Sequence, residues 1–275
     1  MIIRKKISAR YLIVVAFSAT MLLSCQDVIN INLKNSAPRI VIEGSISNIS
    51  DSVFILIHRS TDYFTPSEIT SVNDAEVSIV DSAGNTHELV NIMDGVYAAP
   101  GFHAKTGDVF NLIVNEGGTE YTANSKMPQF VELESVFIDS NPNHPREDRI
   151  NLLINDPAGV ANYYQVEVFK NDTLLNDGSH FLLYSDKYFD GKSNYFSISG
   201  RRLGIERFLP GDSIRVRLIN IEKTMYDYLD VLHSITDEMQ ILSASTPSNP
   251  PGNIDNGALG YFAAWSISEK TLIIK

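Results

Sequence analysis

The feature that most constrains the fold is a series of short runs that alternate apolar and polar residues or are rich in β-branched residues, each closed by Gly, Asn, Asp or Ser. The first seven runs are Arg39–Ile46, Val53–Arg59, Glu76–Asp81, Thr86–Val90, Val96–Ala98, Val109–Val114 and Thr119–Ala123. A period of two is typical of strands that bury one face. Strands of this length and spacing predict a β-sandwich over residues 38–127.

Met127-Pro128 closes this domain, and residues 128–275 predict a second β-rich domain. Its expected strands are Leu133–Asp139, Arg149–Asn155, Asn162–Lys170, Ser213–Ile219, Gly260–Ile267 and Leu272–Ile274. A loop is expected over 140–146. The second and third of these strands are expected to pair across Asp156-Pro157-Ala158-Gly159, a sequence typical of a turn.

One amphipathic helix is expected at about 223–242. Its apolar residues recur at three and four positions, in the order Tyr226, Leu229, Leu232, Ile235, Met239 and Leu242. Such a stripe predicts packing against a sheet. The loop 243–257 is too long for a simple connector, so it is expected to be functional or mobile. The predicted fold is therefore mainly β, with two β-sandwich-like domains, the second carrying one amphipathic helix.

The N-terminal segment has the order of a secretory signal, with a basic start and an apolar run over 11–23. It ends in Leu22-Leu23-Ser24-Cys25, which looks like the bacterial lipobox. That resemblance implies that the sulfur of Cys25 takes a diacylglycerol, whose acyl chains are of the palmitate type. Cleavage then occurs before Cys25. Residues 1–24 are thus expected to be a lipoprotein signal peptide and 25–37 a lipidated linker. The alternatives are an ordinary secretory signal or an anchor helix.

The net charge and the motifs of the sequence reduce the number of functional classes to consider. The chain has a net charge of -11, and the signal removes four basic residues, so the mature net charge is -15. This argues against nucleic-acid partners. There is no Gly-x-Ser-x-Gly elbow and no phosphate-binding glycine loop, and the six histidines lack zinc spacing. We expect no catalytic, cofactor-binding or metal-ligating residues, no cofactor and no enzymatic activity.

Two polar segments are candidates for a cation site. Asp139, Asn141 and Asn143 alternate as in a calcium loop, but Pro142 and His144 break its pattern. Asp186 and Asp190, beside Gly191, offer ligands for a hard cation, although Asp and Gly together are also typical of a turn. Exposed aromatic residues offer another kind of site; the candidates for stacking on a ligand are Tyr63, Phe64, Tyr188 and Phe189.

The order of segments closely resembles a family of Bacteroidota outer-membrane lipoproteins, domain of unknown function four-two-four-nine. The matching pieces are the lipobox, Pro38-Arg39-Ile40-Val41-Ile42-Glu43-Gly44, Tyr121-Thr122-Ala123 before Met127-Pro128, Asp186-Lys187-Tyr188-Phe189-Asp190-Gly191-Lys192, Pro210-Gly211-Asp212, Tyr226-Asp227-Tyr228 and Gly260-Tyr261-Phe262. The resemblance implies an outer-membrane lipoprotein made alongside a TonB-dependent receptor, with no established activity.

Two further resemblances concern shorter segments. The 73–97 region is similar to the transthyretin-like β-domains attached to carboxypeptidases and TonB-dependent receptors. An Asp followed by Ser or Thr and an aliphatic residue is similar to the O-glycosylation site of exported proteins in the same bacterial group. The candidate acceptors are Ser52, Ser82, Thr173 and Ser213. The same pattern also serves as a turn entering a strand.

The leading hypothesis is a lipid-anchored, non-enzymatic accessory or ligand-binding partner of a TonB-dependent receptor, located at the outer membrane and attached through Cys25. Which side of the membrane it faces is not readable from the sequence. The alternative is a surface lipoprotein that binds glycans or peptides without a receptor. A third hypothesis is a hydrolase whose carboxylates meet only in the fold.

Overall fold

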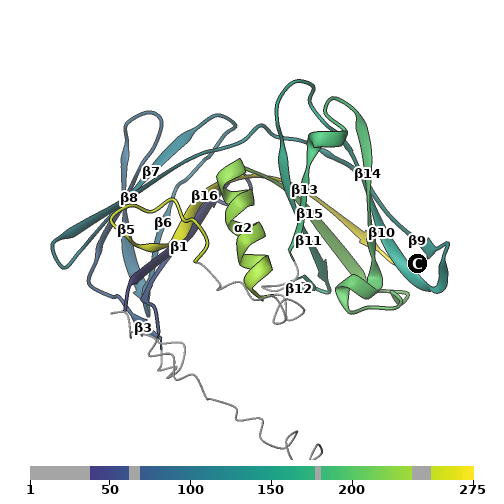
Figure 1. The fold of residues 1–275 in the computed structure, drawn as a ribbon, viewed down its shortest axis with the longest axis horizontal. Helices are drawn as coiled ribbons and strands as arrows, with labels where there is room; N and C mark the ends of the chain where they lie inside the picture. The colour runs from purple at the N-terminus through teal and green to yellow at the C-terminus, as the bar shows by residue number, and fades with distance from the viewer. Residues whose placement is uncertain (1–37, 62–68, 177–180, 237–248) are drawn as a thin grey trace, which may run out of the picture. The chain divides into compact units, whose positions relative to one another are not determined.

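The computed structural model describes residues 38–61, 69–176, 181–236 and 249–275, and Pro38–Lys275 forms one compact unit. Within these residues the chain is mainly β, with two sheets and one α-helix (Figure 1). The predicted lipidation site, Cys25, lies outside the described residues. The part of the chain that is described contains no helix long and apolar enough to cross a membrane.

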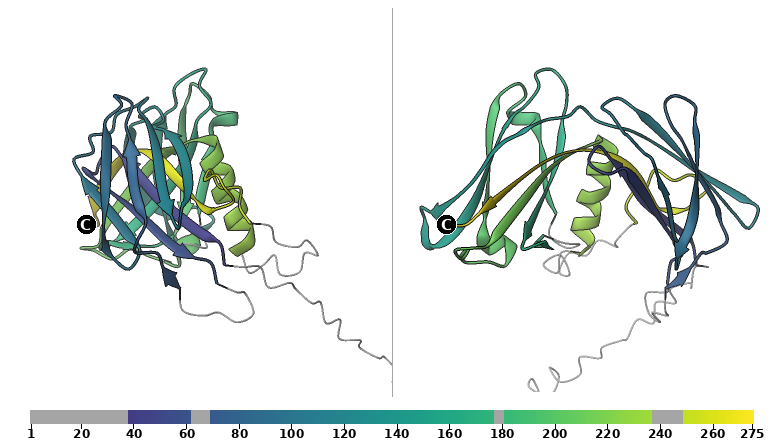
Figure 2. Two further views of the ribbon diagram at one scale, coloured as in Figure 1. Left: turned by 90° about the vertical axis from the view of Figure 1, so that its left-hand side faces the viewer. Right: turned by 180° about the vertical axis from the view of Figure 1, so that it is seen from behind.

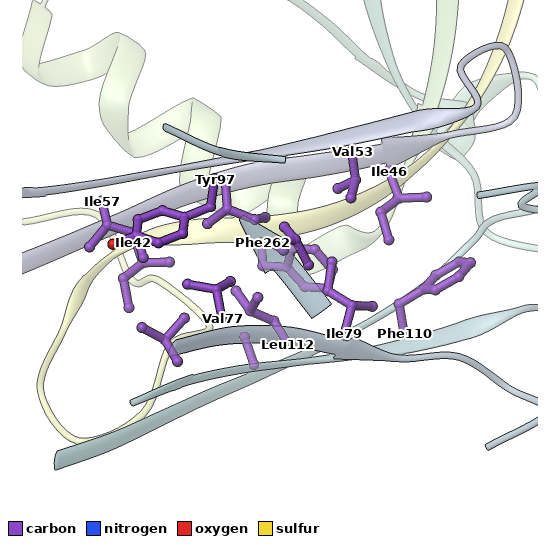
Figure 3. Packing of buried hydrophobic residues seen from close by; sticks show 14 of the residues in the cluster. Ile42, Ile46, Val53, Ile57, Val77, Ile79, Tyr97, Phe110, Leu112 and Phe262 are labelled. Atoms are coloured by element: carbon purple, nitrogen blue, oxygen red, sulfur yellow. The ribbon is translucent and has the colours of Figure 1, made fainter. Parts of the chain in front are cut away.

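The strands of the first half are β1 Ile40–Ser47, β2 Ser52–Arg59, β3 Thr70–Ser71, β4 Glu76–Val80, β5 Thr86–Met93, β6 Val96–Pro100, β7 Val109–Glu116 and β8 Thr119–Lys126. They pair in the order β1-β2-β6-β5-β4-β7-β8, with β3 beside β2. Figure 3 shows the core side chains between two layers of strands. From one layer come Ile42, Ile57 and Tyr97, and from the other Val77 and Leu112, all 1% exposed or less. The alternation in the sequence thus marks the buried face.

The second half contains β9 Leu133–Asn141, β10 His144–Asn155, β11 Tyr163–Lys170, β12 Thr173–Leu174, β13 Leu182–Ser185, β14 Ser193–Ser199, β15 Ser213–Ile221 and β16 Leu259–Ile273. Two short 3-10 turns, η1 Asp186–Tyr188 and η2 Gly200–Leu203, flank β14. A three-stranded sheet, β14-β10-β9, packs on β11 and β15 around a second core. Ile150 and Leu152 of β10 meet Val166 and Val216 there, all fully buried.

The C-terminal strand β16 belongs to both halves. Its first part pairs in parallel with β1, and its second part pairs antiparallel with β15 (Figure 2). Phe262 and Ala264 therefore enter the first core, although they lie far beyond the predicted boundary at 127/128. Gly260 opens the parallel pairing with φ +95°, and a Cβ there would lie 2.1 Å from the Ile42 oxygen. Only glycine fits this close approach. The two-domain boundary itself stays a prediction.

The helix α2, Lys223–Thr236, follows β15 and packs on β16 through Met225 and Leu229. Its start agrees with the predicted helix, whereas residues beyond 236 lie outside the described part. The buried stripe is centred on Met225 and Leu229, and Ile235, expected on the apolar face, is 39% exposed. Together with Ile219, Tyr261 and other residues the helix forms a third, smaller core.

Three local predictions were wrong. Residues 140–146 form no long loop, because β9 and β10 meet in a tight hairpin through Pro142 and Asn143. The strands β10 and β11 do not pair, since the turn after Asn155 carries the chain from one sheet to the other. The two C-terminal strands are one, β16. Each error concerns which segments pair, a property that local alternation does not encode.

The last part of the predicted 243–257 loop has a structural role. The Asp255 carboxylate accepts hydrogen bonds from the Thr122 backbone N–H at 2.6 Å and from the Thr122 hydroxyl at 2.7 Å. Asn253 Nδ2 donates to the Phe262 oxygen at 2.8 Å and to the Asn124 oxygen at 3.1 Å. These bonds cover the open edge of β8, which would otherwise expose unpaired backbone groups. Residues 243–248 lie outside the described part.

Candidate functional site

A groove of about 310 Å³ lies between α2 and the outer face of β1, β2 and β16. We call it the aromatic groove, and it is lined by Glu43, Gly44, Ser45, Phe54, Met225, Tyr228, Leu229, Leu232, Tyr261 and Trp265. Its volume is at the lower end of the range of about 300–1,000 Å³ for small-molecule pockets. It therefore suits a small ligand or a single side chain.

Strand register explains why these residues share one face. Ile42 and Ile46 of β1 point into the first core, so Glu43 and Ser45 point the other way. Glu43 is registered with Tyr261 of β16, and Ser45 is registered with Phe54 of β2. The helix supplies the opposite wall. The ring of its Tyr228 lies 5.2 Å from the ring of Tyr261, measured between centroids and tilted by 51°.

Within the part of the chain that the structure describes, Glu43 is the only acidic residue that lines the groove, and no lysine or arginine lines it. No hydrogen bond or salt bridge joins its carboxylate to another residue of the described chain. Burial, and then the charge of Glu43, raises the pKa of the Tyr228 hydroxyl. Burial also raises the pKa of Tyr261, to about 12. The groove thus carries a negative charge among neutral rings.

Trp265 provides a hydrogen-bond donor that the protein does not use. Its indole Nε1 is buried and has no hydrogen-bond partner among the described residues. In contrast, the hydroxyl of Tyr261 is bonded to Thr224 Oγ1 at 2.6 Å. An unpaired buried donor is unfavourable by about 1–3 kcal/mol. Trp265 therefore contributes its ring to the groove wall, while its N–H stays buried.

Beside the groove, the outer face of β2, β6 and β5 exposes large apolar side chains. We call it the apolar face and define it by Phe54, Leu56, Val90 and Met93, which are 53%, 37%, 64% and 61% exposed. Register links Phe54 through Ala98 to Val90, and Leu56 through Val96 to Met93. Phe54 belongs to both the face and the groove. Contiguous exposed apolar surface of this kind marks sites that contact other molecules.

A second cluster gathers carboxylates near the turn after β10. We call it the aspartate cluster: Asp156, Asp186 and Asp190 offer oxygens that all lie within 4.8 Å of one another. The predicted pair of Asp186 and Asp190 thus meets a third residue that sequence reasoning assigned only to a turn. Carboxylate oxygens are ligands that hard cations prefer, so these three residues are the ones able to hold a metal.

The cluster is nevertheless well satisfied by the protein. Asp156 accepts a hydrogen bond from the Tyr164 hydroxyl at 2.5 Å and from the Gly191 N–H at 3.0 Å. Asp186 accepts from the Asn162 N–H at 2.7 Å, and Asp190 from the Gly159 N–H at 2.8 Å. Burial, and to a lesser degree the charges of Asp186 and Asp190, raises the pKa of Asp156. These bonds tie the turn after β10 to η1.

The calcium-like segment of the sequence is occupied by an ion pair. Arg149 donates two hydrogen bonds to Asp139, at 2.5 and 2.8 Å. This holds the pKa of Asp139 down at about 2. Asn141 Nδ2 instead donates to Glu147 at 3.3 Å. The three residues do not converge on one point, in keeping with the poor match to a calcium loop.

Two other cavities lie beside buried polar side chains that are hydrogen-bonded within the protein. One of about 470 Å³ lies beside the β9–β10 hairpin, where the buried Glu147 is bonded to Ser199 and to the Arg201 N–H. The other, of about 550 Å³, surrounds Asn220, whose side-chain amide donates to the Gln129 oxygen and to Asn162. Their buried polar groups already have partners, so neither cavity carries the signal seen in the aromatic groove.

The four predicted O-glycosylation sites lie at strand ends or turns. Thr173 is exposed, and no hydrogen bond of its hydroxyl is seen within the described residues. Ser82 Oγ accepts from the Val109 N–H at 2.5 Å, Ser52 Oγ donates to Asp51 at 3.1 Å, and Ser213 is half-buried. Their modification stays a prediction, with Thr173 the most accessible acceptor.

The aromatic residues predicted to stack on a ligand differ in their surroundings. Tyr63 and Phe64 lie outside the described residues. Tyr188 is 83% exposed. Phe189 packs in the second core against Tyr164 and Phe196. Sequence reasoning missed Phe54 and Trp265, although the alternation of Tyr261, Ala263 and Trp265 on one face of β16 was available as a signal.

Comparison with known proteins gives one family match. A family model described as "Domain of unknown function (DUF4249)" matches residues 26–271. No curated protein matches the chain. Among solved structures, a two-domain fibronectin type-III segment of chicken tenascin is 12% identical, with a TM-score of 0.22, and covers 67% of this chain and 91% of its own.

A second solved structure is the BSP domain of a biofilm-associated protein. It is 10% identical, with a TM-score of 0.26, over 65% of this chain and 26% of the other. Scores this low carry no argument about function.

Proposed function

The chain belongs to the DUF4249 family, whose description assigns no activity, and from this premise we propose that it is a lipid-anchored envelope protein that acts as a non-enzymatic accessory or ligand-binding partner of a TonB-dependent outer-membrane receptor. The N-terminal lipobox supports the anchor, with Cys25 as the lipidated residue. The acyl chains of a bacterial lipoprotein hold it stably at a membrane.

The observation that carries the proposal is the apolar face. Four large side chains on adjoining strands stand open to solvent, and the face continues into the aromatic groove through Phe54. Protein interfaces have an apolar centre and are depleted of charge. An accessory protein needs a surface for its receptor and a site for its cargo, and these two features adjoin here.

The test is co-purification from gently solubilised outer membranes. We expect the native protein to bring a TonB-dependent receptor with it. Val90→Glu should abolish this association, because the added charge would be buried at the interface. The matched control is Leu209→Glu, which adds the same charge at a residue that is 62% exposed and lies in the second half of the chain.

The outcomes separate the parts of the proposal. Cys25→Ala should release the protein into the soluble fraction, and a variant still held by membranes in high salt would exclude lipid anchoring. Repeated recovery of the native protein alone, in mild detergent, would favour the alternative of a stand-alone glycan- or peptide-binding lipoprotein. The open ring of Tyr188 is the feature that favours this alternative.

A further inference from the structure

The chemistry of the aromatic groove points to a class of ligand. Its described walls carry four aromatic rings, those of Phe54, Tyr228, Tyr261 and Trp265, and the single charge among these lining residues is the carboxylate of Glu43. The faces of aromatic rings attract cations, and the attraction increases when the cation is desolvated. A carboxylate adds a direct charge partner. Together these groups are complementary to an organic cation and repel an anion.

One site in the second half combines an aromatic ring, cations and a carboxylate, and there the cations come from the chain itself. In the second half, the ring of Phe169 lies 4.3 Å from the Arg215 guanidinium and 5.0 Å from that of Arg217. Both arginines pair in turn with Glu269. Among the described residues, the groove has the rings and the carboxylate but no lysine or arginine in its lining. This arrangement is open to a cation supplied by a ligand.

We propose that the aromatic groove binds an organic cation, with an alkylated ammonium group lying between Glu43 and the rings of the groove. This deepens the proposed function and rests on its claim that the protein binds a ligand. The volume of about 310 Å³ admits a small molecule or one cationic side chain. The net charge of -11 favours the approach of a cation.

Trp265 makes the test direct, because it is the only tryptophan in the chain and it lines the groove. Full-length protein in a maltoside detergent is titrated with choline, a quaternary ammonium alcohol, while tryptophan emission is recorded. The control ligand is the uncharged analogue of choline in which carbon replaces the nitrogen. We expect choline to change the emission saturably and to bind at least about tenfold more tightly than the analogue.

Two variants assign the charge. Glu43→Gln should weaken choline binding by about tenfold or more, because it removes the carboxylate and keeps the side-chain shape. Glu88→Gln is the matched control, since Glu88 is also an exposed glutamate on a strand, outside the groove; its affinity should equal that of the native protein. Titration with Nα-acetyl-lysine amide distinguishes a lysine side chain from a quaternary ammonium as the preferred source.

Equal binding of choline and its analogue would overturn the proposal, as would an affinity that Glu43→Gln leaves unchanged. Absence of any response at millimolar choline and lysine amide would also overturn it. These results are independent of receptor co-purification. Failure of the titration with the receptor still bound removes only the ligand class, whereas loss of the receptor with choline still bound removes only the accessory role.

Discussion

The aspartate cluster and the aromatic groove both bring reactive side chains together, but they differ in whether the protein satisfies them. In the cluster, each carboxylate accepts at least one hydrogen bond from the backbone or from Tyr164. In the groove, Glu43 has no bonded partner among the described residues, and the buried Nε1 of Trp265 has none either. The cluster joins a turn to η1, whereas the groove leaves the exposed carboxylate of Glu43 available.

The difference indicates where to look for function. Buried polar groups in folded proteins are nearly always hydrogen-bonded, so a satisfied cluster is explained by the fold alone. The Glu43 carboxylate is different, because it is exposed in the groove, has no bonded partner among the described residues and is available to a ligand. By this criterion the acidic residues that looked most like a site in the sequence are structural, and the groove is the better candidate. The following predictions test that division.

The largest effect should come from Asp156→Ala. Asp156 is only 6% exposed, and its loss leaves the Tyr164 hydroxyl and the Gly191 N–H without their acceptor. Loss of the acceptor of the buried Tyr164 hydroxyl, together with the part-buried bond from Gly191, should lower the free energy of unfolding by about 3 kcal/mol. Urea unfolding followed by circular dichroism measures this. Asp190→Ala is the control, and because Asp190 is exposed its effect should stay below about 1 kcal/mol.

A stability equal to or greater than that of the native protein in Asp156→Ala would contradict this interpretation. It would mean that repulsion among the three carboxylates outweighs their hydrogen bonds. The hydrogen bonds of the aspartate cluster would then not explain its presence, and the contrast between a structural cluster and an available groove would not hold.

The next effect compares the same chemical change in both regions. Tyr164→Phe removes a hydroxyl that donates to Asp156, so it should lower the free energy of unfolding by about 2 kcal/mol. Tyr228→Phe removes a hydroxyl for which no hydrogen bond is seen in the described chain, and its effect should be below about 0.5 kcal/mol. Parallel urea titrations measure both. Equal losses in the two variants would show that the groove hydroxyl also has a structural role.

The strands were predictable because alternation is a local property. Runs such as Val109–Val114 show their buried face in the sequence, and β7 confirms it with Phe110, Leu112 and Val114 in the core. Pairing was less predictable. Nothing in the sequence near Leu259 indicates that β16 passes from β1 to β15 along its length, because both partners are distant in the sequence, and those in β1 lie more than two hundred positions away. The helix start was also local and agreed.

The candidate sites follow the same rule. Asp186 and Asp190 were recognised because they are neighbours in the sequence, but Asp156 joins them only through the fold. The groove combines Glu43, Phe54, Tyr228 and Trp265 from four separate elements, so no spacing in the sequence could reveal it. The sequence also does not show whether a polar side chain has a hydrogen-bond partner. Tyr164 finds its partner Asp156 across a turn, and the Trp265 indole has no partner among the described residues.

The smallest effect is a pH dependence that separates Asp156 from ordinary paired aspartates. Burial, first, and the neighbouring charges of Asp186 and Asp190 raise the pKa of Asp156 above its usual 3.8, so the folded state favours its protonated form. Its contribution to stability is then complete below about pH 3.8 and is lost as the pH rises through the folded pKa. The unfolding free energy of the native protein relative to Asp156→Asn should therefore fall as the pH is raised.

Asp212 provides the opposite sign as a control. Its carboxylate accepts from the Leu209 N–H and from Asn171 and pairs with Lys170 at 2.9 Å, which lowers its pKa from 3.8 to about 2. Relative to Asp212→Asn, the native protein should lose stability as the pH falls from about 4 to 2. Urea titrations from about pH 2 to about pH 7 measure both differences. If the two differences changed with pH in the same direction, Asp156 would be an ordinary paired carboxylate. Because the groove tyrosines titrate only in the alkaline range, acid pH changes the cluster without changing the charge of those rings.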